Sequence, residues 1–362
     1  MTFSQLHAHK IAVLGAGSWG LTLAWLLAAH APSDYSNPNA PTTVAGTAVP
    51  DIWLWDRNAL KIEQFQKNRE IPFPVSVTLP ESVHLTHDLT EAIDQADIIL
   101  LAVSSVGTRQ VASQLAALQL PATTVIVNAS KGIELPSLKT MWAVVSEVLP
   151  KQPYATLSGP NLAKEILRGL PTAGVVATVN PDIGRFLQLA LSRENRFRLY
   201  TTTDVLGVEL GAALKNVFAI ASGYMQAKQL GENARAALIT RGLAEMTRFS
   251  VALGADEQTL YGLSGLGDLL ATCNSPLSRN FQVGFELAKG HPLDQILADL
   301  KVTAEGVNTT HAVSQLAERR GWDAPIVKEV ELALRGDAAA AGNEQIMIRS
   351  LMGRKLKAEA LG

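Results

Sequence analysis

The chain has 362 residues, of which 47% are hydrophobic and 18% charged, so a disordered protein is excluded and the length allows two domains or one large one. A formal net charge of −2 gives no electrostatic reason to expect nucleic acid or an anionic membrane as a partner. The single cysteine, Cys273, excludes an intrachain disulfide framework and fits a reducing compartment, where we expect it to be a small buried apolar residue.

The first feature along the chain is an uncharged apolar stretch, residues 11–29, that contains GAGSWG. By length it qualifies as a membrane anchor, since about 20 apolar residues cross a bilayer. Its glycines, Gly15, Gly17 and Gly20, instead fit G-x-G-x-x-G between a predicted strand and a predicted helix, which is typical of dinucleotide-binding folds. In that loop the first glycine permits a tight turn, the second admits a pyrophosphate and the third allows close helix packing.

The second predicted strand, residues 52–56, ends on an acidic residue. An aspartate at that place usually bonds the ribose hydroxyls, about 20 residues after the loop. Asp56 lies further on, and a Pro-, Ser- and Thr-rich surface insertion at residues 32–50 accounts for the excess. Arg57 follows at once and can accommodate a 2′-phosphate. Asp56 favours NAD and Arg57 favours NADP, so the cofactor is predicted as NADH or NADPH with the preference open.

Further apolar runs and helix-like stretches alternate up to about residue 200. The strand-like runs lie at 97–104, 124–129, 154–158, 173–178 and 197–200. This alternation predicts an open parallel sheet with helices on both faces. Later segments have helical periodicity only, at 205–228, 233–253, 281–289 and 311–320. The predicted fold class is therefore α/β: an N-terminal Rossmann-type doubly wound sheet (1–202) followed by an all-α C-terminal domain (203–362), which we expect to be substrate-binding and catalytic.

Two lysines stand in segments that suit catalysis. Lys131 lies in NASKGIE just past a predicted strand, where ligands bind in open α/β sheets, and Lys215 lies in ELGAALKNV. A lysine in apolar surroundings can have its pKa lowered towards neutrality and act as a general base. Asn216 and Asp268 are polar residues that could orient it. Either lysine could instead be an ordinary surface residue.

Seven motifs in order carry a resemblance to a known family. They are GAGSWG (15–20), SKGIE (130–134), SGP (158–160), LKN (214–216), GLGDL (265–269), SRN (278–280) and AEG (304–306). On these motifs the chain resembles the NAD(P)-dependent sn-glycerol-3-phosphate dehydrogenase family up to about residue 355. The resemblance implies interconversion of dihydroxyacetone phosphate and sn-glycerol 3-phosphate by hydride transfer at C2, which supplies the backbone of glycerophospholipids.

The resemblance also implies roles for individual residues. Lys215 would accept the C2 hydroxyl proton, Lys131 would contact substrate and nicotinamide, and Asp268 would hold Lys215 in register. Substrate contacts are implied for Lys131, Gly159, Asn161, Lys215, Asp268, Thr272, Ser278, Arg279 and Asn280. Cofactor contacts are implied for Gly15, Gly17, Ser18, Trp19, Gly20, Asp56, Arg57, Lys131, Ala163, Arg279, Thr303 and Glu305.

The chain departs from the family pattern at four places, the first being the longer loop at residues 32–50. Asn161 stands where Ser or Thr is common, residues 104–106 replace a proline-containing turn, and residues 71–74 replace a Tyr-Leu-Pro-Gly pattern. We expect no metal, no stable membrane insertion, a homodimer and a cytoplasmic location, with His84 and His87 on a solvated loop. The alternatives are a dehydrogenase of a 3-hydroxy acid and a redox sensor that binds dinucleotide without turnover. The membrane anchor is the weakest alternative.

Overall fold

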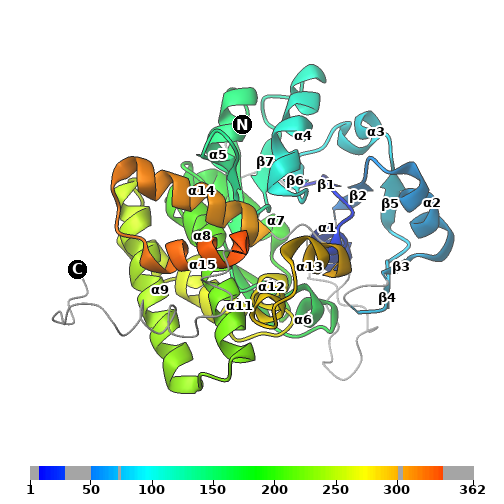
Figure 1. Ribbon diagram of the computed structural model, residues 1–362. Helices are drawn as coiled ribbons and strands as arrows, with labels where there is room; N and C mark the ends of the chain where they lie inside the picture. Colours follow the sequence, from blue (N-terminus) through cyan, green and yellow to red (C-terminus); the bar gives the residue numbers. More distant parts are fainter. Residues whose placement is uncertain (1–7, 29–49, 72–74, 301–304, 337–362) are drawn as a thin grey trace. The chain divides into compact units, whose positions relative to one another are not determined.

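The computed structural model describes residues 8–28, 50–71, 75–300 and 305–336 (Figure 1). It divides into two compact units: Met1–Ser130 with Met141–Val205, and Lys131–Thr140 with Leu206–Gly362. A single domain boundary between residues 202 and 203 stays a prediction, and the structure adds that residues 131–140 pack with the second unit. The predicted insertion lies outside the described residues, apart from Pro50.

The first unit is built on an eight-stranded sheet in the order β12-β11-β10-β7-β6-β1-β2-β5. All neighbouring strands are parallel except β10 and β11, which are antiparallel. The strands are β1 (Lys10–Leu14), β2 (Asp51–Trp55), β5 (Val83–Thr86), β6 (Ile98–Leu101), β7 (Val125–Asn128), β10 (Tyr154–Ser158), β11 (Thr172–Ala177) and β12 (Phe197–Thr202). Strand order reverses between β1 and β6, the place where doubly wound sheets bind ligands.

Helices connect these strands and bury them. The apolar runs of β1, β6 and β7 are almost wholly buried, as expected for parallel strands covered on both faces. The helices of this unit are α1 (Ser18–Ala28), α2 (Ala59–Asn68), α3 (Leu89–Ile93), α4 (Ser105–Ala117), α5 (Met141–Val148), α6 (Ala163–Leu167) and α7 (Pro181–Leu191), with a short hairpin of β3 (Glu70–Ile71) and β4 (Val77–Thr78). The prediction of a Rossmann-type doubly wound sheet is confirmed.

The expectation of a solvated loop at His84 is wrong. His84 lies in β5, where its ring stacks on Trp53 with centroids 4.7 Å apart and its Nε2 lies 2.9 Å from Asp51. The strand was missed because only four residues pair and His84, at its second position, points to solvent.

The second unit is helical apart from a hairpin of β8 (Ile133–Glu134) and β9 (Lys139–Thr140). Its helices are α8 (Val205–Ala227), α9 (Glu232–Ala252), α10 (Glu257–Leu260), the π-helical turn η2 (Leu263–Gly267), α11 (Asp268–Cys273), α12 (Arg279–Ala288), α13 (Leu293–Leu300), α14 (Glu305–Arg320) and α15 (Pro325–Arg335). Among the described residues, α8 is the one helix long and apolar enough to cross a membrane. Its apolar window is 94% buried inside the protein, which is typical of a core helix.

Candidate active site

The glycine loop joins β1 to α1 at the carboxyl edge of the sheet. Gly15 has a φ of 111°, and a Cβ there would lie 2.8 Å from the Ala102 carbonyl oxygen. A Cβ on Gly20 would lie 1.8 Å from the Gly15 oxygen, so the loop and α1 require both glycines. A Cβ on Gly17 would meet nothing within 4 Å, which leaves this face open to a ligand.

The start of α1 adds groups suited to a pyrophosphate. The helix begins at Ser18, so its first backbone N–H groups and its dipole face the loop. The indole Nε1 of Trp19 is buried and makes no hydrogen bond within the described chain. The loop therefore fits a dinucleotide pyrophosphate, with open space beside Gly17.

Asp56 follows β2 and lies beside the same loop. Its Oδ2 accepts a hydrogen bond from the Ala16 backbone N–H at 3.0 Å and another from Lys61 Nζ at 3.0 Å. Its Oδ1 accepts from the Asn58 backbone N–H at 3.0 Å. Arg57 is exposed. Lys61 was not among the predicted site residues. It stands five residues after Asp56, and the sequence does not show which side of its helix faces that carboxylate.

Three further predicted residues of the first unit follow β10. Gly159 has a φ of 132°, and a Cβ there would lie 2.8 Å from the Cα of Gly174 in β11, so only glycine fits. Both amide atoms of Asn161 are buried and have no hydrogen-bond partner in the described chain. Ala163 opens α6. The polar atoms of Asn161 are therefore available to a ligand.

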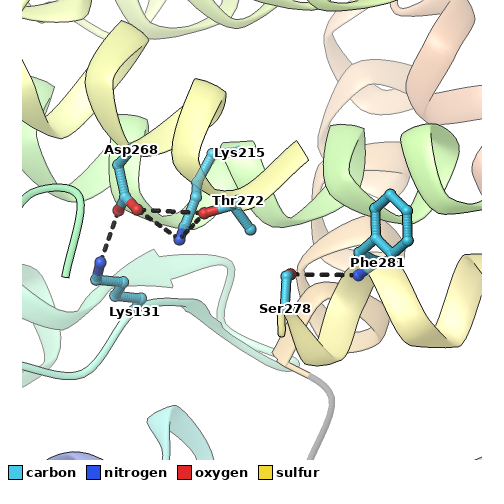
Figure 2. A network of polar contacts seen from close by, with 6 residues as sticks. All are labelled: Lys131, Lys215, Asp268, Thr272, Ser278 and Phe281. Atoms are coloured by element: carbon cyan, nitrogen blue, oxygen red, sulfur yellow. Dashed lines mark hydrogen bonds and ion pairs between the residues drawn. The ribbon is translucent and has the colours of Figure 1, made fainter. Parts of the chain in front are cut away.

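In the second unit four predicted residues form one buried network (Figure 2). Asp268 Oδ2 accepts from Lys131 Nζ at 2.6 Å, and Asp268 Oδ1 accepts from Lys215 Nζ at 2.8 Å. The Thr272 Oγ lies 2.6 Å from Lys215 Nζ and 3.2 Å from Asp268 Oδ1. The Lys215 side chain is 9% exposed and that of Asp268 is 3% exposed, whereas Lys131 reaches 18%. One carboxylate thus orients two ammonium groups.

A π-helical turn positions Asp268 opposite Lys215. The Gly267 N–H bonds to the Gly262 carbonyl, which closes the wider turn and places Asp268 at the start of α11. Gly211, one turn before Lys215 on α8, packs so closely that a Cβ would lie 2.8 Å from the Ser264 oxygen. π-helical turns are frequent at functional sites, and here the turn and the close helix contact set the lysine–aspartate distance.

The charges of this network shift its pKa values. Burial lowers the pKa of Lys215 to about 8; the carboxylate of Asp268 opposes that shift and the charge of Lys131 adds to it. Burial acts to raise the pKa of Asp268, but the charges and hydrogen bonds of Lys131 and Lys215 outweigh it and lower that pKa. Burial raises the pKa of the neighbouring Cys273 thiol to about 12, so this cysteine is an inert buried residue. Lys215 is thus a lysine able to exchange a proton near neutral pH.

The SRN motif lies at the start of α12, because this helix begins at Arg279, two residues before the predicted start at residue 281. Ser278 is the N-cap, and its Oγ accepts from the Phe281 N–H at 3.3 Å (Figure 2). Arg279 and Asn280 are in the first helical turn. Asn280 Oδ1 accepts from the Gly306 N–H at 3.1 Å, which ties α12 to α14.

One predicted cofactor residue lies at the start of α14. Glu305 is its first residue. Thr303 lies outside the described residues. Within the described ranges, no three His, Cys, Asp or Glu side chains gather closely enough to hold a metal ion.

Comparison with known proteins covers both units. Residues 10–183 match the family model for the NAD-dependent glycerol-3-phosphate dehydrogenase N-terminus, and residues 204–341 match that for the C-terminus. A glycerol-3-phosphate dehydrogenase (NAD(P)+) of Nitratidesulfovibrio vulgaris strain DP4 is 43% identical over 97% of this chain and 100% of its own length. One from Synechococcus sp. strain JA-2-3B'a(2-13) is 41% identical over 98% of both chains. The crystal structure of glycerol-3-phosphate dehydrogenase from Coxiella burnetii superposes with a TM-score of 0.84, at 33% identity, over 95% of this chain and 99% of that one.

A Rossmann-type unit with a glycine loop, followed by a helical unit with a buried lysine–aspartate pair, defines an NAD(P)-dependent oxidoreductase that acts on a CH–OH group. The sequence and structural matches give the particular family. The chain belongs to the NAD-dependent glycerol-3-phosphate dehydrogenase family, as its motifs predicted.

Proposed function

We propose that this protein interconverts dihydroxyacetone phosphate and sn-glycerol 3-phosphate with NAD(H) or NADP(H), and that Lys215 is its acid–base residue. The observation that carries this proposal is the buried network of Lys131, Asp268, Lys215 and Thr272. A carbonyl reduction needs a proton donor at the oxygen and positive charge where negative charge develops. The network supplies both.

Lys215 moves the proton at the C2 oxygen. With a pKa of about 8 it is largely protonated at neutral pH and can give its proton to the forming alkoxide. In the oxidation direction the neutral amine takes the hydroxyl proton back. The nicotinamide, when bound, supplies or accepts the hydride at C2.

Asp268 and Lys131 shift the pKa of Lys215 in opposite directions, and Lys131 adds positive charge to the site. Asp268 holds the Lys215 ammonium by a 2.8 Å bond and, through its charge, keeps the lysine pKa from falling further. Lys131 is the more exposed of the two lysines and is the one proposed to contact both substrate and cofactor. Thr272 fixes the direction of the Lys215 ammonium and can contact substrate.

The phosphate of the substrate would bind at the start of α12. The Ser278 oxygen is used as the helix cap, but its O–H remains a donor. Arg279 offers a planar fork that can donate two bonds to phosphate oxygens, and the helix N–H groups favour an anion. Asn280 is held by Gly306 and presents its amide N–H₂. Gly159 and Asn161 are proposed as further substrate contacts, the buried Asn161 amide replacing a hydroxyl.

Cofactor binding is proposed for the loop and its neighbours. The glycines and the start of α1 would bind the pyrophosphate, and residues around them would contact the ribose or the nicotinamide. These residues are Gly15, Gly17, Ser18, Trp19, Gly20, Asp56, Arg57, Lys131, Ala163, Arg279, Thr303 and Glu305. We further propose that the enzyme is a cytoplasmic homodimer and supplies the glycerophospholipid backbone.

The test is oxidation of NADH and NADPH with dihydroxyacetone phosphate, beside unphosphorylated dihydroxyacetone. We expect the phosphorylated ketone to be far the better substrate, and Lys215→Ala to lose at least about two orders of magnitude in rate. Lys328→Ala, which removes an exposed lysine of the same unit, is the matched control and should keep full activity. Absence of turnover by a wild type that still binds both cofactors would contradict the proposal and favour a redox sensor.

A further inference from the structure

We propose that Gly306 is a positioning residue, which holds the Asn280 amide where it can bind the substrate phosphate at a fixed spacing from Lys215. This inference rests on the proposed function, in which Lys215 exchanges the proton and the start of α12 binds the phosphate. Gly306 closes the AEG motif (304–306), in which a cofactor contact is proposed for Glu305 alone.

Gly306 lies between two helices that carry parts of the proposed site. Its backbone N–H donates to Asn280 Oδ1 on α12 at 3.1 Å. A Cβ at this position would lie 2.5 Å from the same oxygen and 3.1 Å from the backbone oxygen of Asn216 on α8. Asn216 directly follows Lys215 in the chain. Gly306 is therefore packed between the backbone beside the lysine and a side chain of the proposed phosphate site.

The close contact, and not the backbone conformation, requires a glycine at this position. Gly306 is the second residue of α14 and is not among the described glycines with a positive φ, so other residues could adopt its conformation. Glycine is less favourable than alanine within a helix. An alanine lacks only the room for its Cβ, which would overlap the Asn280 oxygen.

The hydrogen bond also determines which way the Asn280 amide faces. Because the Gly306 N–H is a donor, the amide oxygen of Asn280 points towards it and the N–H₂ group points away. An N–H₂ group is the donor that a phosphate oxygen needs. A side chain at position 306 would displace the oxygen and turn this donor out of its place.

Two further glycines hold α12 against the helix that carries Lys215. A Cβ on Gly223 of α8 would lie 1.9 Å from the Phe281 oxygen, and a Cβ on Gly284 of α12 would lie 1.8 Å from the Ile220 oxygen. The two backbones are therefore in direct contact near the start of α12. Ile220 stands about 7.5 Å along α8 from Lys215, five residues at about 1.5 Å each. Because backbone packs on backbone, the spacing between the lysine and the start of α12 does not depend on flexible side chains.

The experiment compares Gly306→Ala, Asn280→Ala and the double variant with wild type in the steady-state reduction of dihydroxyacetone phosphate. Each single variant should raise KM about tenfold or more and leave kcat within about threefold, because a contact to the remote phosphate acts alike in the ground state and the transition state. The double variant should be no worse than Asn280→Ala, since the new Cβ then has no amide to displace. Gln315→Ala, an exposed change on the same helix, should keep both constants within about twofold.

Two further measurements separate positioning from a general loss of structure. An alanine at position 306 displaces mainly the end of the Asn280 side chain, so the melting temperature of Gly306→Ala should stay close to that of wild type. The pH at which kcat/KM declines should be the same in all variants, because no charged group near Lys215 changes.

Losses that add in the double variant would overturn the inference, since Gly306 would then act independently of Asn280. An unchanged KM in a folded Gly306→Ala protein would overturn it as well. So would a Gly306→Ala protein that does not fold and is not rescued by Asn280→Ala, because the role of Gly306 would then be structural only. Absence of turnover in wild type would instead refute the proposed function on which the inference rests.

Discussion

Replacing Asp268 by asparagine removes the carboxylate that the buried Lys215 shares with the partly buried Lys131. The amide keeps a single acceptor oxygen and turns an N–H₂ group towards one of the ammonium groups, which lie 2.6 and 2.8 Å from the native oxygens. Removing one partner of a buried ion pair costs about 3–5 kcal/mol. We expect the lower end, about 3 kcal/mol, since a lysine can lose its proton, and therefore a fall in melting temperature of roughly 6–12 °C.

The larger effect of Asp268→Asn should be on kcat/KM. In the proposed mechanism the reduction of dihydroxyacetone phosphate needs protonated Lys215, so kcat/KM should fall as pH rises through about 8, and oxidation should show the reverse trend. Asp268 raises the Lys215 pKa by its charge and its hydrogen bond, whereas Lys131 lowers it. Without the carboxylate the pKa of Lys215 falls further, so the decline of kcat/KM with rising pH begins at lower pH. We therefore expect kcat/KM at neutral pH to drop by roughly 10²–10⁴.

The assay is the pH dependence of kcat/KM for Asp268→Asn, beside Thr272→Val as the matched control. Thr272→Val removes one contact of Lys215 without changing any charge. It should therefore lower kcat/KM about tenfold and leave the pH at which kcat/KM declines unchanged. Wild-type activity and an unmoved pH limb in a folded Asp268→Asn protein would refute the assignment of Asp268 as the residue that sets the charge of Lys215.

The glycines give further predictions. Gly17→Ala should keep the melting temperature but lose dinucleotide affinity in a binding titration, because its Cβ enters open space that the pyrophosphate needs, whereas Gly20→Ala should prevent normal folding, with a Cβ 1.8 Å from the Gly15 oxygen. Gly284→Ala places a Cβ 1.8 Å from the Ile220 oxygen, so denaturant unfolding should show a loss of more than about 3 kcal/mol. Gly107→Ala, on α4 with no atom closer than 3.5 Å, should instead gain about 0.5–1 kcal/mol in the same assay.

Periodicity predicted the sheet because its central strands are buried on both faces and read as continuous apolar runs. Such a run carries no sign of direction, so the antiparallel pairing of β11 with β10 could not be predicted from it. The strand β5 carries little apolar signal, because it has only four residues and lies at the edge of the sheet, where His84 is exposed. Sequence patterns therefore predicted the layers but not the edge strand β5, the antiparallel pairing of β11, or the short hairpins β3–β4 and β8–β9.

Site residues were identified by type and motif, but their pairings depend on tertiary structure. Lys131 and Asp268 meet across 137 positions, and no local spacing relates them. Their residue roles stay predictions, although the structure brings Lys131, Lys215, Asp268 and Thr272 together. Lys61 could not be inferred, because its importance comes from the carboxylate it contacts and not from a motif.

The shared carboxylate also explains why two lysines suit this site better than one. With both lysines protonated, the network of two lysines and Asp268 carries a net charge of +1, which in the proposed mechanism lies beside the oxyanion that develops at C2. When Lys215 delivers its proton, the same three groups become neutral, so the stabilising charge is present before proton transfer and is removed by it. A site with Lys215 and Asp268 alone would begin neutral and end as an uncompensated buried anion, which low-dielectric surroundings penalise. In the proposed mechanism, Lys131 therefore prevents the network from becoming a net anion when Lys215 gives up its proton.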